Sequence, residues 1–338
     1  MISEMIETGT WLPYLFAFLM GFSMLVYGLL DGYDLGVGIL SGTTRYRAEK
    51  DTMIASIGPF WDANETWLVL GVGILLVAFP KAHGVILGQL YLPVFIMLVG
   101  LIFRGVAFDF RSKSQSKYHI WWDRAFAIGS LVTALAQGYM LGSYIVGFDS
   151  SFGSIVFSCL VSIGVAIGYC LIGANWLIMK TEGQLQKKSV RWAKLSLYGA
   201  VACIFLVSVG TPAASLRIFE KWFAYPNIFY LSPIPGITAI LIFLMFTTLQ
   251  KLPKKNDQHC WVPFVLTVGV AIMCFIGLAY SFFPFIVPNE MLIIQAAAAR
   301  SSLLIILVGA LIVLPILIGY TFIAYRVFHG KSTTLRYD

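Results

Sequence analysis

The sequence predicts an all-α integral membrane protein, and three observations support this fold class. Of the 338 residues, 59% are hydrophobic and 12% are charged, whereas soluble domains carry about 25% charged residues. The mean hydropathy is +0.84. The apolar residues gather in runs of about 20, the length that crosses a bilayer as a helix. A water-soluble fold, a disordered chain and a secreted disulfide scaffold are therefore excluded.

Nine segments have the length and hydrophobicity of spanning helices, the sixth and seventh being the shortest. They are 12–40, 54–79, 85–108, 122–147, 155–179, 195–211, 233–250, 262–287 and 302–326. The connections between them are short, so we predict a single polytopic membrane domain over residues 1–338. The first apolar run is longer than the core of a signal peptide, and we expect it to be a retained helix.

The distribution of Lys and Arg predicts the orientation. Of these 23 residues, 18 lie near the ends that follow the odd-numbered segments and 4 lie at the opposite ends. Basic residues collect on the cytoplasmic side, so we predict that the N-terminus is outside and the C-terminus inside. The net charge of +7 then belongs to an inner rim that faces anionic lipid, and we expect no nucleic-acid partner.

The longest connection, 212–232, is external in this topology and rich in aromatic residues. Two interpretations remain open for it. The favoured one is a segment at the level of the lipid headgroups, where Trp and Tyr are common. The other is a cover over a partner subunit or a quinone.

Ionisable side chains inside the first three segments are the main functional signal, because each costs about 2.5–3.5 kcal/mol to insert at a helix centre. They are Asp31 and Asp34, then Asp62 and Glu65, then Arg104 and Asp109. At about 1.5 Å per residue, all but Asp109 lie roughly 9–16 Å from the inner end, and Asp109 lies nearer the rim. Short loops make these segments neighbours, so we predict one charged cluster.

Four carboxylates around one deeply placed Arg cannot form a neutral group if all are ionised, so we expect at least one carboxyl to hold a proton. Such a group suits a proton path from the inner face, and the alternative is a static network that holds helices together. The predicted pathway comprises Asp31, Asp34, Trp61, Asp62, Glu65, Arg104 and Asp109. Asp62 is the first choice, with Trp61, Asn64 and Trp67 expected to form a dry, hydrogen-bonding wall around it. A solvated helix end is the simpler interpretation of Asp109.

Small residues and histidines add two expectations. Gly28, Gly32 and Gly36 recur every four residues, a stripe that lets helices approach closely. Packing within the chain is slightly favoured over a subunit interface. No histidine lies in the middle of a segment, and a buried haem needs an axial ligand. We therefore expect this chain to hold neither a haem through histidine nor a metal.

Long, ordered blocks of the sequence carry a resemblance to a known family. They are DGYDLGVGIL, IGPFWDANETWLVLGVGILLVAFP, YLP, GLIFRGVAFDFRSK and WWDRAFAIGS, with FFPFIVPN further on. The chain resembles subunit II of the bacterial cytochrome bd-type quinol oxidases, most densely over residues 28–130. Its length, and Glu65 at a position that is a neutral amide in some members, resemble the shorter branch that includes cyanide-insensitive oxidases.

The resemblance implies an oxidoreductase complex of the bacterial cytoplasmic (inner) membrane. It would oxidise quinol, reduce dioxygen to water with protons from the cytoplasm, and build a proton gradient without pumping. Haems b and d and the quinol site would belong to the larger subunit I, so this chain would carry no directly catalytic residue. A structural quinone in this subunit and a small single-span subunit are further expectations from the family.

The resemblance also implies two four-helix bundles plus one peripheral helix, and a proton route past Trp61 and Asp62. Trp67, Asp31 and Asp34 match nearby family positions. Two other functions remain open from the residues alone. One is an ion-coupled secondary transporter, although the charges lie in the inner third and no repeat is evident. The other is a purely structural scaffold for an oxidase.

Overall fold

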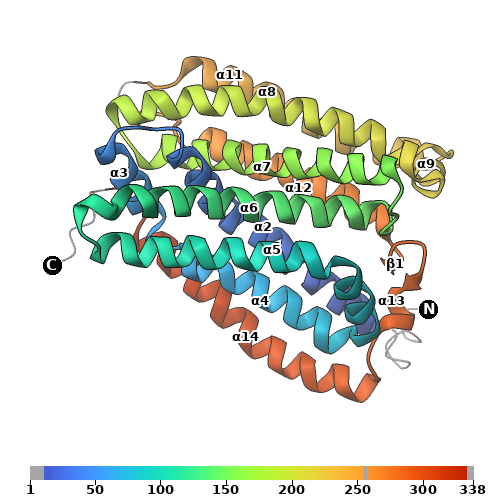
Figure 1. The fold of residues 1–338 in the computed structure, drawn as a ribbon. Helices are drawn as coiled ribbons and strands as arrows, with labels where there is room; N and C mark the ends of the chain where they lie inside the picture. Colours follow the sequence, from blue (N-terminus) through green and yellow to red (C-terminus); the bar gives the residue numbers. More distant parts are fainter. Residues whose placement is uncertain (1–10, 255–256, 333–338) are drawn as a thin grey trace.

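The computed structural model describes residues 11–254 and 257–332, in which nine helices are long and apolar enough to cross a membrane (Figure 1). The long helices are α2 (Trp11–Ser41), α4 (Trp61–Ala78), α5 (Pro80–Lys113), α6 (His119–Ile145), α7 (Phe152–Lys180), α8 (Gly183–Ala214), α11 (Pro233–Lys251), α12 (Val262–Phe282) and α14 (Arg300–Val327). Short elements are α3 (Arg47–Ile57), η1 (Ser116–Tyr118), α9 (Leu216–Phe223), α10 (Asn227–Leu231), β1 (Phe285–Val287), β2 (Met291–Leu292) and α13 (Ile293–Ala296). The all-α class and the nine candidate spans agree with the sequence.

Several predicted boundaries are wrong. The sixth segment was expected to begin at 195, but α8 begins twelve residues earlier, at Gly183. Proline explains two of the other differences. The second segment was expected to begin at 54, but the chain around Pro59 separates α3 from α4, and the candidate span begins at Trp61. The eighth was expected to reach 287, but α12 ends at Phe282, just before Pro284. Proline has no N–H to continue a helix and restricts the residue before it. Beyond Pro284 the chain forms a small antiparallel pair of strands, β1 and β2.

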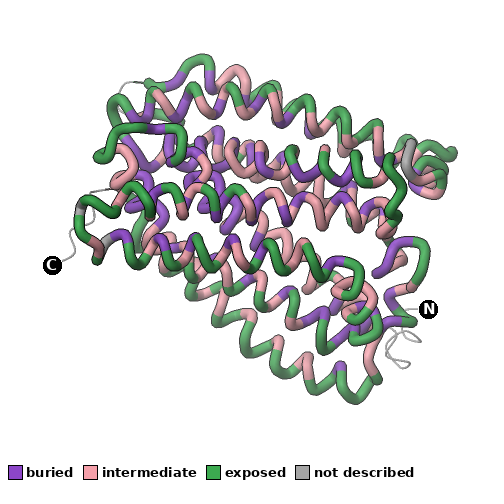
Figure 2. The backbone as a smooth tube through the Cα atoms, in the orientation of Figure 1, coloured by how far each residue is buried: buried purple, intermediate pink, exposed green. Residues whose placement is uncertain are grey.

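The long helices form two groups of four around the inner helices α2 and α7. In the first group α2 contacts α4 and α6, and α5 contacts α4 and α6. In the second group α7 contacts α8 and α12, and α11 contacts the same two helices. Contacts of α7 with α2 and α6 join the groups, while α14 lies against α4 and α2. Figure 2 shows that most of α14 is exposed, and its one buried residue is Leu303.

The seam between α2 and α7 depends on glycine. A Cβ atom on Gly36 would lie 1.8 Å from the carbonyl oxygen of Tyr169, and one on Gly32 would lie 2.7 Å from its ring. Gly28 faces the same tyrosine more loosely, at 3.9 Å from the hydroxyl. The glycine stripe therefore brings two helices of this chain together, which is the packing that small residues allow in membranes.

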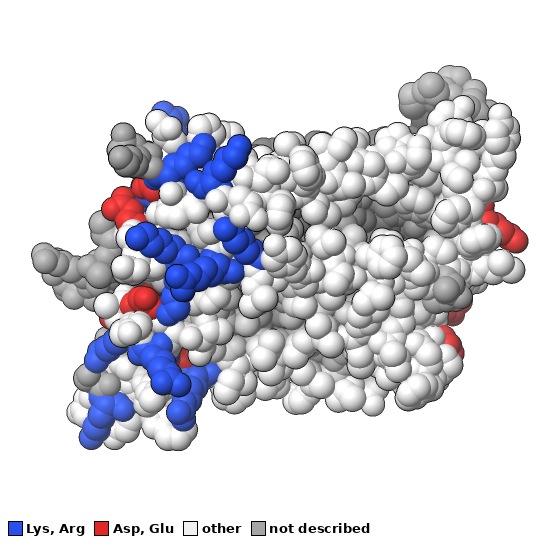
Figure 3. Space-filling model, turned by 90° about the horizontal axis from the view of Figure 1, so that it is seen from above, with Lys and Arg blue, Asp and Glu red and all other residues white. Residues whose placement is uncertain are grey.

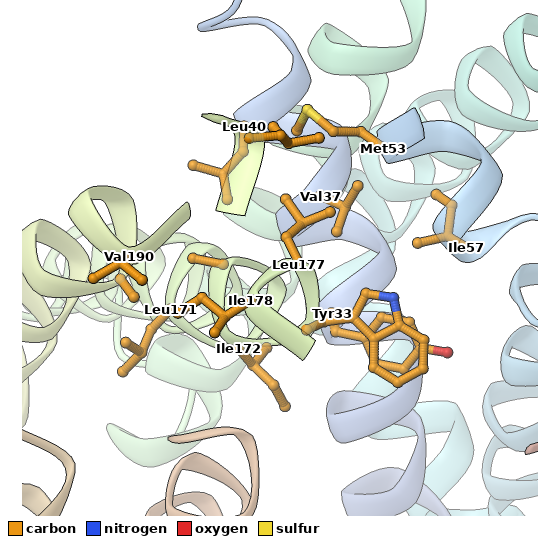
Figure 4. Close-up of a cluster of buried hydrophobic side chains, with 14 of the residues drawn as sticks. Tyr33, Val37, Leu40, Met53, Ile57, Leu171, Ile172, Leu177, Ile178 and Val190 are labelled. Carbon is orange, nitrogen blue, oxygen red and sulfur yellow. The ribbon is translucent and has the colours of Figure 1, made fainter. Parts of the chain in front are cut away.

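Close approach at this seam buries a large apolar cluster. Figure 4 shows part of it, with side chains contributed by α2, α3, α7 and α8: Tyr33, Val37, Leu40, Met53, Ile57, Leu171, Ile172, Leu177, Ile178 and Val190. The Tyr33 ring stacks on Trp176 with centroids 4.2 Å apart. This packing holds the C-terminal half of α2, and with it the charged residues of that helix, in a fixed position.

The two ends of the molecule differ in composition. Lys and Arg side chains gather at the end that carries α3, as Figure 3 shows. Two of the basic residues counted for the inner rim, Lys255 and Arg336, lie outside the described residues. At the opposite end the 212–232 connection forms α9 and α10, where Lys221 donates to the carbonyl of Tyr280 over 2.6 Å. Phe229 and Tyr230 are exposed there, which leaves an aromatic surface.

A charged and hydrogen-bonded cluster in the first helix group

Arg104 of α5 is the centre of a charged cluster inside the first group. Its Nη1 atom lies 2.6 Å from Asp31 Oδ1 and 3.4 Å from Glu65 Oε1. Its Nη2 atom lies 4.0 Å from Asp34 Oδ2. Arg104 is 1% exposed, both aspartates are fully buried, and the Glu65 side chain is 28% exposed. The structure thus brings together residues from three consecutive spans, α2, α4 and α5.

Local geometry explains why α2 supplies both aspartates. Residues three apart in a helix share a face, so Asp31 and Asp34 both point towards Arg104. Helix α2 is surrounded by α4, α6 and α7, which buries nearly every residue from 31 to 40. Three carboxylates then share one guanidinium group. If all were ionised, two negative charges would lack a cationic partner. Because Asp31 and Asp34 are both fully buried, at least one of these charges would lie in the interior, and burying an unpaired charge is very costly.

Asn64 of α4 connects this cluster to two tyrosines. Its Nδ2 atom donates to Asp34 Oδ2 over 2.8 Å and to the Tyr33 hydroxyl over 3.0 Å. The Tyr33 and Tyr325 hydroxyls are 2.6 Å apart, and Tyr325 donates to Asn64 Oδ1 over 3.4 Å. A chain of hydrogen bonds therefore runs from Asp34 to α14, close to the basic end of the molecule.

Tyr33 and Tyr325 were not predicted from the sequence. Tyr33 lies inside the block DGYDLGVGIL, next to Asp34, and its position beside a membrane carboxylate was the available signal. Tyr325 lies in the last turn of α14, and nothing in its local sequence indicates that it meets α2. That contact depends on where the ninth span packs.

A neutral group lies on the other side of Asp31. Gln137 of α6 donates to the Tyr27 hydroxyl over 2.6 Å and accepts from the Tyr169 hydroxyl over 2.7 Å. Tyr27 is one helical turn from Asp31 on α2, towards the start of that helix. These bonds join α2, α6 and α7 through uncharged groups, which is the usual role of amide side chains between membrane helices.

Asp62 lies apart from the cluster, and the expected wall around it is wrong. Asp62 is exposed on the surface of the chain, whereas Asn64 and Trp67 are buried. Residues two apart in a helix differ by about 200° in direction, so Asp62 and Asn64 cannot point the same way. Glu65 lies between the two directions and is partly exposed. It is the cluster carboxylate nearest in sequence to Asp62.

The two tryptophans and Asp109 occupy different surroundings. The Trp61 ring lies 6.0 Å from the guanidinium carbon of Arg104 and packs on Phe108, with centroids 5.0 Å apart. Trp67 is buried, and its ring meets Phe22 edge-on at 6.0 Å. Asp109 is exposed on α5. Of the two tryptophans, Trp61 therefore lies beside the charged cluster, and Trp67 contributes to the apolar packing.

The described residues form no cluster of the kind that usually holds a metal ion. No group of three or more His, Cys, Asp or Glu side chains in residues 11–254 and 257–332 is arranged to hold a metal ion. The histidines of this part of the chain lie at helix ends or in connections: His83, His119, His259 and His329.

Comparison with known proteins identifies the family. A model of the cytochrome bd terminal oxidase subunit II family matches residues 12–328. The chain belongs to this family. It is 26% identical over 371 aligned residues to cytochrome bd-I ubiquinol oxidase subunit 2 of Escherichia coli (strain K12), with 95% of each chain covered. It is 28% identical over 324 aligned residues to cytochrome bd ubiquinol oxidase subunit 2 of Bacillus subtilis (strain 168), covering 89% of this chain and 91% of that one.

A solved structure supports the same fold for this subunit II. A chain of the bd oxidase from Geobacillus thermodenitrificans superimposes with a TM-score of 0.76 at 15% identity. The match covers 94% of this chain and 98% of that one. The arrangement of spans that brings α2, α4 and α5 together thus belongs to a fold seen in a bd oxidase.

Proposed function

We propose that this subunit II assembles with a larger, haem-bearing subunit I and supplies it with protons from the cytoplasm for the reduction of dioxygen to water. The relatives from E. coli and B. subtilis are subunits of ubiquinol oxidases, which supports a quinol as the electron donor. Haems b and d belong to the partner in this proposal, and this chain carries no residue that touches the reacting oxygen. The complex builds a proton gradient without pumping.

The proposed orientation has the N-terminus outside and the C-terminus inside the cytoplasmic membrane. It is supported by the basic end of the molecule, because positive residues favour the cytoplasmic side. The whole chain then acts as one membrane domain. In this orientation the aromatic surface of α9 and α10 lies at the outer headgroup level.

The observation that carries the proton route is the excess of buried carboxylates over Arg104. One guanidinium group lies within 4.0 Å of three carboxylates, so the cluster binds protons rather than holding three full negative charges. A site that can gain or lose a proton inside the membrane is what a proton relay needs. Asp31, Asp34, Glu65 and Arg104 form this relay in the proposal.

Two connections extend from the relay towards the surface. On one side, the partly exposed Glu65 leads to the exposed Asp62, with Trp61 beside Arg104. A carboxylate exposed to lipid is unfavourable at this depth, so we assign the Asp62 face of α4 to the contact with subunit I. On the other side, the Asn64, Tyr33 and Tyr325 hydrogen bonds lead towards the basic end, where Asp109 also lies near the rim.

The static alternative attributes the same contacts to helix packing, and one set of variants separates the two functions. Glu65→Gln and Asp62→Asn remove a protonatable group while keeping the shape of the side chain. We expect oxygen uptake driven by quinol to fall by about tenfold or more, as in other proteins that lose a proton-transfer group. The assembled complex is purified first, and its haem content is measured to show that assembly is intact.

Glu182→Gln is the matched control. Glu182 is exposed in the connection before α8, so this variant makes the same chemical change outside the cluster. Normal oxygen uptake by fully assembled Glu65→Gln and Asp62→Asn complexes would leave only the structural role. The transporter alternative is dropped, because the chain belongs to an oxidase subunit family.

A further inference from the structure

A cavity of about 400 Å³ opens at the basic end of the molecule and shares no residue with the Arg104 cluster. It lies between the end of α2, α3 and the first turns of α6. Its lining residues are Gly42, Thr44, Arg45, Lys50, Ile120, Asp123, Arg124, Ala127 and Ile128. The lining thus combines cationic and aliphatic side chains.

The charge balance of the cavity favours an anion. Asp123 is the one carboxylate among its lining residues, and it already accepts from Arg111 Nε over 2.6 Å and from Lys50 Nζ over 3.3 Å. Arg45 and Arg124 are exposed, and neither forms an ion pair within the described ranges. Their guanidinium groups can therefore donate hydrogen bonds to a ligand, and guanidinium groups often bind phosphate in a bidentate way.

The surface of α6 next to the cavity is apolar. Trp121, Ile128 and Leu131 are 64%, 60% and 39% exposed, and together with Arg124 they recur at intervals of three or four residues. Such spacing places them on one helix face. The guanidinium carbon of Arg124 lies 5.5 Å from the Trp121 ring. This helix face thus carries a cation and a tryptophan next to exposed aliphatic side chains. Such a combination is typical of the boundary between lipid headgroups and acyl chains.

We propose that this cavity binds the anionic headgroup of a phospholipid from the inner leaflet. Arg45 and Arg124 hold the phosphate, Lys50 adds positive charge beside it, and an acyl chain follows Ile128 and Leu131 along α6. Basic pockets between spanning helices on the cytoplasmic side are known to bind anionic lipid headgroups. The inference rests on the proposed orientation but not on the proton route, because the two sites share no residue.

The test measures lipid binding to the purified oxidase complex in detergent, with fluorescent phosphatidylglycerol as the probe. The double variant Arg45→Gln/Arg124→Gln removes the two exposed cations of the cavity. We expect its dissociation constant for phosphatidylglycerol to be at least about tenfold weaker, because each basic residue near an anionic lipid adds to the attraction. Lys187→Gln/Arg191→Gln is the matched control, since it removes two exposed cations of α8 at the same end.

Further arms separate a lipid from other occupants. Ala127→Phe fills the cavity without a change of charge, and we expect it to weaken binding as well. Fluorescent phosphatidylcholine should bind more weakly than phosphatidylglycerol, and inorganic phosphate should displace the probe only weakly. Equal losses in the cavity and control variants, or equal binding of the two lipids, would overturn the proposal. If inorganic phosphate displaced the probe at a concentration similar to the dissociation constant of phosphatidylglycerol, the cavity would be a site for free phosphate instead.

Discussion

The two groups of four helices use different chemistry in their interiors. The first group buries Arg104 with three carboxylates. In the second group the polar contact between α7 and α12 is neutral, because Asn175 Nδ2 donates to Thr267 Oγ1 over 2.8 Å and to the carbonyl of Pro263 over 3.4 Å. Met245 of α11 completes that contact through its sulfur. The first group thus contains a buried charged cluster in addition to its neutral hydrogen bonds, whereas this contact in the second group is neutral.

This difference shows that charge is not required for helix packing in this protein. Neutral hydrogen bonds join the helices of the second group, and such bonds are the common means of association in membranes. A buried ion pair must overcome a large desolvation cost, and replacing it with apolar residues is often neutral or stabilising. The buried charges of the first group are what the proposed proton relay requires.

The largest expected effect comes from removing the cation of the first group. Arg104→Gln leaves Asp31, Asp34 and Glu65 without their guanidinium partner, and breaking a buried pair in this way costs about 3–5 kcal/mol. We expect a severe loss of folded complex, measured by size-exclusion chromatography of the solubilised membranes. The double variant Arg104→Gln/Asp31→Asn should recover part of the yield. A normal yield of the Arg104→Gln variant would show that the three carboxyl groups are neutral without the cation.

A smaller effect is expected from placing a charge in the second group. Asn175→Asp puts a carboxylate next to Thr267, and the hydrogen-bond partners of Asn175 among the described residues include no cation. Insertion scales give about 2.5–3.5 kcal/mol for such a group. Thermal unfolding of the purified complex measures the loss, which should diminish as the pH falls because protonation removes the charge. Asn175→Ala is the control, with a cost of about 1–3 kcal/mol that does not depend on pH. If Asn175→Asp and Asn175→Ala lowered the stability equally at every pH, a buried charge would not be the cause, which would contradict the comparison between the two helix groups.

The smallest effect concerns a contact between the groups at the basic end. Glu49 of α3 accepts from Lys188 of α8 over 2.8 Å and from Thr44. Burial raises the pKa of Glu49, but these hydrogen bonds outweigh burial and lower it from its usual value. A carboxyl whose pKa is lower in the folded state stabilises the fold above its unfolded pKa, about 4.3, and this stabilisation is lost as the pH falls through the folded pKa.

Glu49→Gln should therefore lower the stability at pH 7 by about 0.2–1 kcal/mol, the range of partly exposed ion pairs. Thermal unfolding at pH 7 and below about pH 4 measures the difference between the variant and the wild type, with the pH range set by the usual Glu pKa. We expect the difference to shrink at the lower pH. Glu182→Gln, again the exposed control, should change neither value. A constant difference across this pH range would assign the effect to packing and not to charge.

The sequence alone determined the class of fold, the number of candidate spans and the depth of the charges along each helix. Depth can be predicted because the rise per residue is a constant of the helix, so Asp31, Glu65 and Arg104 had to lie at similar levels. The blocks around these residues also indicated the family. Proline positions were visible in the sequence, but which of them would end a helix was not evident from hydrophobicity.

Only the tertiary structure decided which side chains at one depth meet. The direction of a side chain depends on which face of its helix is packed against neighbours, so Asn64 points inwards and Asp62 points outwards although both lie in the same turn. The contact of Tyr325 with Tyr33 joins residues 292 positions apart, and no local pattern contains that information. The cavity beside Arg45 and Arg124 arises in the same way, because it exists only where the end of α2 and the start of α6 come together.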